Sequence, residues 1–230
     1  MPDSSIYRPL PKVLLFDVNE TLLDMGKLKR AVPKAFGNKH AFKQWFGLLL
    51  YYSLVDTVTG TYHPFGHIAE AALDMTADML EEKRLSPTTK KELVGLLSQL
   101  PAHPDVPRGL QMLLDAGFRL VAFTNSPQLT LDAQLRYAGI IHFFERGLSV
   151  DEVQLYKPHF HTYQAALQTL GVAPTEVLLV AAHGWDVAGA QDAGLRSGFI
   201  ARPGQTLYPL ATPPTYQGKD LPSLARQIIG

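Results

Sequence analysis

The sequence contains no cysteine, so disulfide bonds, thiolate catalysis and cysteine-ligated metals are excluded. It also lacks an excess of charge of either sign, because 21 Lys and Arg residues balance 21 Asp and Glu residues. Binding to nucleic acid or to an anionic membrane surface requires a basic excess, so neither partner is indicated. The lack of cysteine fits a reducing compartment, and we expect a cytoplasmic protein.

No hydrophobic run is long enough to cross a bilayer. The longest apolar-rich stretch, FKQWFGLLLYYSLV at 42–55, is too short and is interrupted by polar residues. The N-terminal sequence MPDSSIYRPLPK is polar and contains proline, unlike the charged and then apolar layout of a secretory signal. With 46% apolar and 18% charged residues among 230, the composition is that of a soluble globular protein with a large core.

Four apolar runs predict strands: VLLFD (13–17), RLVAFTN (119–125), VLLVAAH (177–183) and SGFIAR (197–202). Continuous apolar runs suit strands that are covered on both faces, as in a parallel sheet. Helical patterns precede the last three runs, so we expect βαβ crossovers and an α/β fold with an open parallel sheet. The tail at 203–222 is rich in Pro, Gly, Thr and Tyr and is expected to be irregular, before a short C-terminal helix.

The long stretch between the first two predicted strands has no strand pattern and predicts about four helices. The apolar stretch described above is one of them, and it is either deeply buried or lines a cavity. Ser86 and Pro87 predict the start of another helix, with a serine cap and proline at the first helical position. We therefore expect a helical cap domain at 25–104 and a core domain formed by 1–24 and 105–230.

Polar residues follow the predicted strands where each one ends. Asp17 ends the first strand, Thr124 and Asn125 end the second, Lys157 lies in the loop LYKPHF, and Asp186 follows the 177–183 run within AAHGWD. In an open α/β sheet, ligands bind beyond the carboxyl ends of the strands, so the predicted topology gathers these residues at one edge. Their convergence predicts an active site.

Each of these positions also has a structural interpretation. Asp17 and Asp186 are typical of residues that cap a turn or a helix, and Lys157 is equally typical of an exposed surface lysine. Ser126 before Pro127 predicts a helix start, although a helix N-terminus also binds anions. Only the order and spacing of the whole set favour the functional interpretation.

The segments FDVNETLLD, FTNSP, YKP and GWDVAGAQDAGL resemble the four motifs of the haloacid dehalogenase superfamily, in the same order and across nearly the whole chain. The resemblance implies a Rossmann-like core with a helical cap inserted after the first motif. It also implies that Asp17 is the nucleophile, because the first aspartate has this role in every active branch.

Two departures from the phosphatases of this superfamily indicate the branch. Asn19 replaces the aspartate that protonates an alcohol leaving group, and an amide cannot release a proton. Ala181 or Ala182 replaces one of the acids that hold Mg²⁺. A halide departs as an anion and needs only hydrogen-bond donors and positive charge. The resemblance is therefore closest to the type II L-2-haloacid dehalogenases, which share the pair Trp185-Asp186 and imply no metal and no cofactor.

The resemblance to these dehalogenases implies four catalytic residues. Asp17 displaces the halide and forms an ester, which water then hydrolyses. Thr21 hydrogen-bonds near the nucleophile, and Lys157 neutralises it. Asp186 anchors Lys157 and orients or activates the hydrolytic water.

The resemblance also implies a substrate-binding set. Lys43 aligns with a cap arginine of the family but offers one compact charge in place of a planar fork. His183 stands where relatives have asparagine, and it is either a structural residue or a donor to the water or ester oxygen. Trp45 belongs to an apolar cap wall, for which plain cap packing is the alternative. The full set is Thr124, Asn125, Lys43, Trp45, Tyr163, His183 and Trp185.

The sequence thus predicts a hydrolase that converts a short 2-haloalkanoic acid into the 2-hydroxyalkanoic acid and halide. The expected partner is this small-molecule 2-halocarboxylate, and a homodimer is the commonest closed assembly. The alternatives are a magnesium-dependent phosphatase with relaxed motifs and a catalytically silent binding protein.

Overall fold

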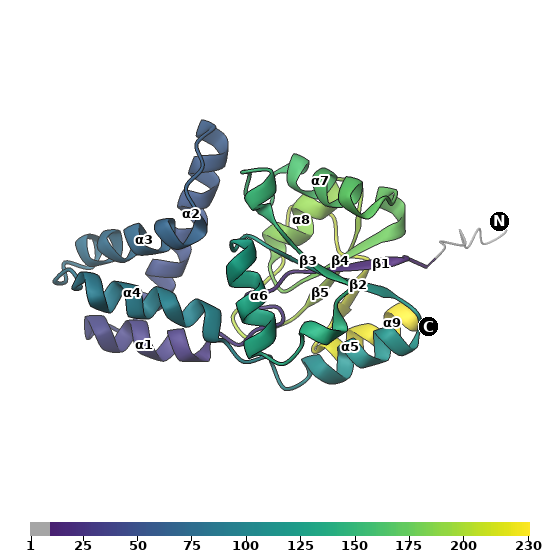
Figure 1. The fold of residues 1–230 in the computed structure, drawn as a ribbon, viewed down its shortest axis with the longest axis horizontal. Helices are drawn as coiled ribbons and strands as arrows, with labels where there is room; N and C mark the ends of the chain where they lie inside the picture. Colours follow the sequence, from purple (N-terminus) through teal and green to yellow (C-terminus); the bar gives the residue numbers. More distant parts are fainter. Residues whose placement is uncertain (1–9) are drawn as a thin grey trace.

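The structure is a computed structural model that describes residues 10–230, and its centre is a parallel β-sheet (Figure 1). The six strands of this part of the chain lie in the order β3-β2-β1-β4-β5-β6. The predicted α/β class with a parallel sheet is confirmed. The strands are β1 (Val13–Phe16), β2 (Arg119–Thr124), β3 (Arg146–Ser149), β4 (Val177–Ala181), β5 (Arg196–Ile200) and β6 (Tyr216–Gly218).

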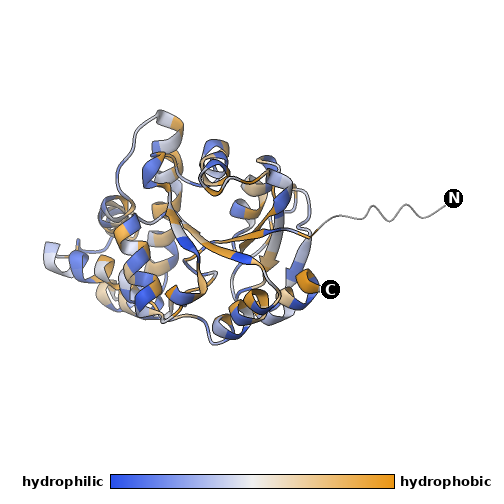
Figure 2. Cartoon of the chain, turned by 45° about the vertical axis from the view of Figure 1, so that its right-hand side comes forward, coloured by the Kyte–Doolittle hydropathy of each residue, from blue (hydrophilic) through white to orange (hydrophobic). Residues whose placement is uncertain are grey.

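The central strands β1 and β4 are buried along their whole length, as their continuous apolar runs predict. Figure 2 shows the strands of the sheet largely in the colour of hydrophobic residues. Both strands end before the predicted limits, so Asp17 directly follows β1 and His183 lies just beyond β4. The backbone N–H of Asp17 donates to the carbonyl of Val180 at 3.0 Å, which fixes the position of Asp17 at the sheet edge.

Helices cover both faces of this sheet. Figure 1 shows α5 and α9 together on one side and α7 and α8 together on the other. Because β1 lies between β2 and β4, the chain changes direction beside β1, and such a switch point opens a crevice at the carboxyl ends of the strands. The helices are α5 (Val106–Asp115), α6 (Gln128–Tyr137), α7 (Phe160–Leu170), α8 (Gly184–Asp192) and α9 (Leu221–Ile229).

Four helices, called the cap helices below, lie between β1 and α5 in the chain and beside the sheet in Figure 1. One of them begins after Ser86, whose Oγ accepts from the backbone N–H of Thr89 at 3.1 Å, as predicted. The predicted limits of the cap domain stay a prediction. The cap helices are α1 (Gly26–Phe36), α2 (Ala41–Thr59), α3 (Phe65–Met79) and α4 (Pro87–Gly95).

One strand was missed, and two local predictions are wrong. The missed strand is β3, whose sequence, RGLS, is short and polar and lies at a sheet edge. β6 lies inside the tail that was predicted to be irregular, and it too is an edge strand. Ser126 was expected to cap the helix that follows, but α6 begins at Gln128 with Pro127 at the capping position, so Ser126 lies one residue too early. Short edge strands depend on a neighbouring strand and carry little local signal.

Within residues 10–230, no helix combines the length and the apolar character that crossing a bilayer requires. The prediction about the N-terminal sequence falls mostly on residues 1–9, which lie outside the described residues.

A tight contact between α8 and the loop before α7 gives a stability prediction. A Cβ atom at Gly189 would lie 2.3 Å from Pro158 Cβ and 2.8 Å from the Tyr163 hydroxyl. We expect Gly189→Ala to lower the free energy of unfolding by about 1–3 kcal/mol, because one neighbour has to move. Urea denaturation measures this loss. Gly47→Ala in α2, where the added Cβ meets open space, is the control and should be neutral or stabilising.

Candidate active site

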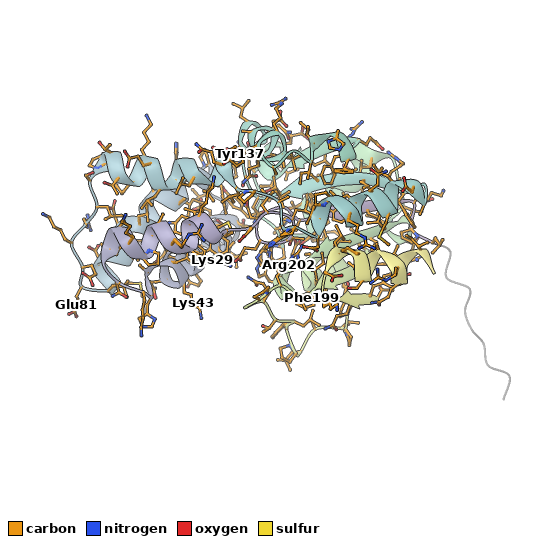
Figure 3. All side chains as sticks on the ribbon, turned by 90° about the horizontal axis from the view of Figure 1, so that it is seen from below. Lys29, Lys43, Glu81, Tyr137, Phe199 and Arg202 are labelled. Atoms are coloured by element: carbon orange, nitrogen blue, oxygen red, sulfur yellow. The ribbon has the colours of Figure 1, made fainter. Side chains whose placement is uncertain are left out.

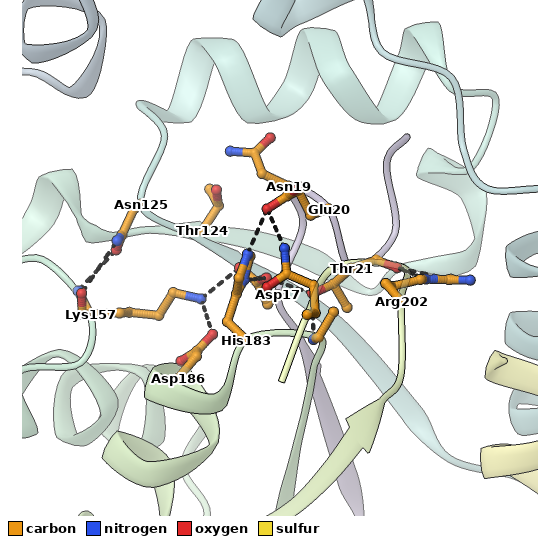
Figure 4. Close-up of polar contacts among 12 residues, drawn as sticks. Asp17, Asn19, Glu20, Thr21, Thr124, Asn125, Lys157, His183, Asp186 and Arg202 are labelled. Atoms are coloured by element: carbon orange, nitrogen blue, oxygen red, sulfur yellow. Dashed lines mark hydrogen bonds and ion pairs between the residues drawn. The ribbon is translucent and has the colours of Figure 1, made fainter. Parts of the chain in front are cut away.

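The carboxylate of Asp17 is the centre of a buried polar cluster (Figure 4). Its Oδ1 accepts from Lys157 Nζ at 3.0 Å. Its Oδ2 accepts from Thr21 Oγ1 at 2.6 Å and lies 2.9 Å from His183 Nδ1. Both oxygens are therefore held by donors, and the carboxylate has a fixed orientation at the end of β1.

The ammonium group of Lys157 is fully engaged. Besides Asp17, Nζ donates to Asp186 Oδ2 at 2.6 Å and to the carbonyl of Phe123 at 3.1 Å, so its three protons have three acceptors. The hydroxyl of Tyr163 donates to the other oxygen of Asp186 at 2.6 Å. This geometry lets Asp186 anchor Lys157, and Tyr163 in turn fixes Asp186.

The electrostatics of the cluster favour an ionised Asp17. Burial opposes the charged form, but the charge of Lys157 and the hydrogen bonds from His183 and Thr21 outweigh it, so the pKa of Asp17 lies well below its ordinary value. Burial also opposes the charge on Lys157, yet Asp17 and Asp186 raise the pKa of Lys157. Burial raises the pKa of Asp186, although Lys157 opposes this shift. Asp17 therefore carries its negative charge beside a protonated Lys157.

His183 connects Asp17 to a second carboxylate, Glu20, which the sequence analysis did not select. Its Nε2 lies 3.2 Å from Glu20 Oε2, and Lys29 Nζ lies 3.0 Å from the other oxygen of Glu20. Burial disfavours the imidazolium, but bonds to Asp17 and Glu20 outweigh it and raise the pKa of His183 to about 9. Counting formal charges, Asp17, Glu20 and Asp186 are balanced by Lys29, Lys157 and His183.

Glu20 reaches this position because of its backbone. Its φ of 60° is in the left-handed region, which non-glycine residues rarely adopt, and its side chain is buried with Gln205 Nε2 donating to it at 2.8 Å. The sequence offered one signal, an acid between Asn19 and Thr21 in the first motif. The inward direction of the Glu20 side chain could not be derived from the spacing of residues in the sequence, because it depends on the φ angle of Glu20.

Arg202 is a second residue that the sequence analysis missed. Its Nε and Nη2 donate to the carbonyl of Thr21 at 3.1 and 3.0 Å, and Nη1 pairs with Asp105 at 2.7 Å. Thr21 itself links two motifs, because its Oγ1 accepts from the N–H of Ala182 at 2.8 Å while it donates to Asp17. Arg202 therefore holds the loop that carries the nucleophile.

Three predicted substrate-binding residues lie around Lys157. Asn125 Oδ1 accepts from the N–H of Lys157 at 2.9 Å, so the side chain of Asn125 holds the loop. Thr124 is buried at the end of β2. The ring of Trp185 stacks on His183 with centroids 5.0 Å apart and lies 5.9 Å from Lys157 Nζ. Their contact with a substrate stays a prediction.

Two predicted residues of α2 lie away from this cluster. Trp45 is fully buried among the cap helices, and its indole N–H donates to the carbonyl of Ala69 at 2.9 Å. This placement matches cap packing and gives no support to substrate binding. Lys43 is exposed and lines a cleft of about 780 Å³ between the cap and the core, which also borders Lys29, Glu20 and Gln205. Figure 3 shows Lys29 and Lys43 on the cap side of this junction and Arg202 on the core side.

The cluster is poorly suited to a divalent metal ion. Among residues 10–230, no three His, Asp or Glu side chains are grouped in a way that could hold one. Lys157 already lies between Asp17 and Asp186, where a cation would have to bind. The amide of Asn19 is also engaged at both ends, donating to Ser126 Oγ at 3.2 Å and accepting from Gln134 Nε2 at 2.9 Å.

The raised pKa of His183 predicts a dependence of stability on pH. Since this pKa is about 9 in the folded protein against 6.5 ordinarily, the contribution of His183 is fully present below pH 6.5 and is lost as pH rises through 9. The loss should be on the order of a few kcal/mol. The lowered pKa values of Asp17 and Glu20 make the stability depend on pH only in the acidic range, below this window.

Urea denaturation between pH 6 and 10 measures this effect. His183→Gln should flatten the profile in that window, whereas His161→Gln, at an exposed position, should leave it unchanged. An unaltered slope in His183→Gln would contradict the assignment.

Comparison with known proteins agrees with this geometry. Residues 11–194 match the family of haloacid dehalogenase-like hydrolases. The chain is 31% identical to (S)-2-haloacid dehalogenase 1 of Pseudomonas sp. (strain CBS-3), covering 83% of this chain and 85% of the relative. It is 28% identical to (S)-2-haloacid dehalogenase of Pseudomonas sp. (strain YL), covering 90% and 89%. The structure of L-2-haloacid dehalogenase from Xanthobacter autotrophicus has a TM-score of 0.87 at 26% identity, covering 96% of this chain and 99% of that one. The chain belongs to the haloacid dehalogenase-like hydrolases.

Proposed function

We propose that the protein is a metal-independent hydrolytic dehalogenase that converts a short (S)-2-haloalkanoic acid into the 2-hydroxyalkanoic acid and halide. The observation that carries this proposal is the buried carboxylate of Asp17, which is ionised beside Lys157, with an amide at Asn19 in place of an acid. The names of the two Pseudomonas relatives supply the substrate class.

The first step is a displacement at carbon. A carboxylate oxygen of Asp17 attacks the carbon that bears the halogen, the carbon–halogen bond breaks, and the halide leaves with the bonding electrons. Asp17 is suited to this role because its carboxylate is buried and held at a fixed angle by Thr21 and Lys157. A desolvated and oriented carboxylate spends little free energy on reorganisation before it attacks.

The leaving group decides between carbon–halogen and phosphate-ester chemistry. An alkoxide needs a proton as it leaves, and Asn19 has none to give. In the fourth motif, Ala181 or Ala182 stands where the phosphatases have an acid, and a methyl side chain cannot bind Mg²⁺. A halide needs neither group, so these residues favour the dehalogenase over the phosphatase alternative.

The second step is hydrolysis of the Asp17 ester. Water attacks the ester carbonyl and gives up both of its protons, one to a neighbouring base and one to the product oxygen. The bond between the carbonyl carbon and the product oxygen breaks, the 2-hydroxy acid leaves, and the carboxylate of Asp17 is restored. Both oxygens of Asp186 are engaged, by Lys157 and Tyr163, so this side chain acts as the anchor. His183 is the better base, because esterification removes the Asp17 charge that holds its proton, while Glu20 keeps its ring in place.

Substrate contacts complete the proposal. Thr124, Asn125 and Trp185 lie next to the Asp17–Lys157 pair, and we assign them to the substrate wall, with Tyr163 supporting Asp186. Lys43 lines the cleft at the junction of cap and core, where a positive charge attracts a carboxylate substrate and a departing halide.

The cytoplasmic location and a homodimer also belong to this proposal. The support for a dimer is an apolar face of α2, where Tyr51, Leu54 and Val58 are exposed at helical spacing. The helical segment at 25–104 is assigned as the cap domain, and the rest of the chain as the core.

Asp17→Asn tests the proposed nucleophile. We expect loss of halide release from 2-chloropropionate by more than about 10³-fold, because an amide nitrogen or oxygen does not displace halide at a useful rate. Mass spectrometry has to verify that the variant has not deamidated at position 17.

The alternatives are separated by an assay of the unaltered protein. Its release of halide and of phosphate is measured side by side on haloacids and phosphate esters, with and without a chelator. Phosphate release that the chelator abolishes would favour the phosphatase, and no release of either would favour the silent binding protein.

His183→Gln tests the base in the second step. We expect esterification to persist while hydrolysis slows by about 10²-fold, so the Asp17 ester accumulates. Rapid quenching and peptide mass spectrometry should find the added mass on the peptide that contains Asp17. His161→Gln is the control, and hydrolysis at the unaltered rate in His183→Gln would rule out this role.

A further inference from the structure

Tyr156, the residue before Lys157, is bound by the cap helices and the loop that joins α2 to α3. Its backbone N–H donates to Thr57 Oγ1 in α2 at 3.0 Å. Its hydroxyl donates to the carbonyl of His63, and its ring packs against Phe65 with centroids 5.9 Å apart. Tyr156 is fully buried although it belongs to a loop of the core.

A second tyrosine strengthens the same contact. The ring of Tyr62 stacks on Tyr156 with centroids 5.3 Å apart and planes at 26°. The hydroxyl of Tyr62 donates to Asp151, whose other oxygen accepts from the N–H of Gln128 at the start of α6. Burial and Asp151 raise the pKa of Tyr62 well above its ordinary value, so this hydroxyl stays a donor. Helix α2 and the loop between α2 and α3 thus contact both Tyr156 and Asp151 of the core.

These contacts of Tyr156 affect Lys157, which is the next residue in the chain. The core holds the backbone of Lys157 through Asn125, whose Oδ1 accepts from its N–H at 2.9 Å. The cap holds the N–H of Tyr156, so the cap fixes one of two consecutive peptide groups and the core fixes the other. The position of Lys157 Nζ, between Asp17 and Asp186, depends on both attachments.

The site also has to open. The side chain of Lys157 is 0% exposed and that of Asp17 is 7% exposed, so groups that cover them have to move before a substrate enters. A movement of the cap helices away from the sheet would separate Tyr156 from Thr57 and His63. We propose that Tyr156 is a positioning residue that couples cap closure to the active site, so that Lys157 is seated against Asp17 only when the cap is closed. The proposal rests on the proposed function, because it assigns a catalytic effect to the placement of Lys157.

Tyr156→Phe removes the hydroxyl donor to His63 and keeps the ring. We expect halide release in a single turnover to slow by about tenfold, because Lys157 and Asp17 lose their fixed geometry. We also expect KM for 2-chloropropionate to change by less than about twofold, because the substitution loosens Lys157 and leaves the residues of the substrate wall in place. The other groups that face Asp17 are Thr21 and His183, with Glu20 and Asp186 behind His183 and Lys157, and the substitution leaves all of them in place.

Tyr137→Phe is the matched control. It removes another hydroxyl contact between cap and core, the hydrogen bond from Lys27 to Tyr137, far along the chain from Lys157. Hydrogen exchange of the backbone at 150–159 is the readout that does not depend on activity, and it should speed up in Tyr156→Phe alone. Should Tyr156→Phe fail to fold, Thr57→Val removes the acceptor of the Tyr156 N–H and is measured in the same way.

Changes in the single-turnover rate and in the exchange of 150–159 in Tyr156→Phe, with KM unchanged and without changes in Tyr137→Phe, would support the proposal. Unchanged exchange and an unchanged single-turnover rate in Tyr156→Phe would overturn it, as would equal changes in both variants. Absence of halide release from the unaltered protein would sink the proposed function instead, while hydrogen exchange would still decide whether the cap fixes this loop.

Discussion

The ammonium group of Lys157, buried between the carboxylates of Asp17 and Asp186, is the interaction on which the rest of the site depends. Removing three charges from water is costly, and the cost is offset only when every proton and lone pair finds a partner. Here the carbonyl of Phe123 takes the third proton of Lys157, and Tyr163 satisfies Asp186. A buried network of this kind has a single arrangement, which is what a nucleophile needs.

The order of the strands makes this network possible. Asp17 follows β1, Phe123 lies in β2, and Asp186 lies in the first turn of the helix after β4, so three neighbouring strands supply the groups around Lys157. The buried strand ends keep the charges away from water, which strengthens each interaction. The sheet therefore fixes both the geometry and the low polarity of the surroundings.

His183 and Glu20 extend this charge network toward the cleft. A histidine at this position adds a positive charge beside the nucleophile, and Glu20 together with Lys29 restores the balance. Three carboxylates and three cations then alternate in a continuous series of ion pairs from Asp186 to Lys29 at the cleft. When Asp17 becomes an ester, this balance changes by one charge, and His183 and Lys157 are the charged groups in contact with the changed oxygens. The cap contributes in a different way, because its contact with Tyr156 acts on the backbone beside Lys157.

The sequence by itself determined the buried strands, the helix that begins after Ser86 and the C-terminal helix, and its resemblance to a family predicted the roles of Asp17 and Lys157. These follow from apolar runs, caps and motif order, which are local properties of the chain. Only the tertiary structure decided the edge strands β3 and β6, the inward turn of Glu20, the burial of Trp45 within the cap and the grip on Tyr156. Each of these depends on a partner distant in the sequence or on a single backbone angle, as with Glu20 and His183, which are 163 residues apart. Local patterns carry no record of such partners, because the free energy that selects them comes from packing in the folded chain.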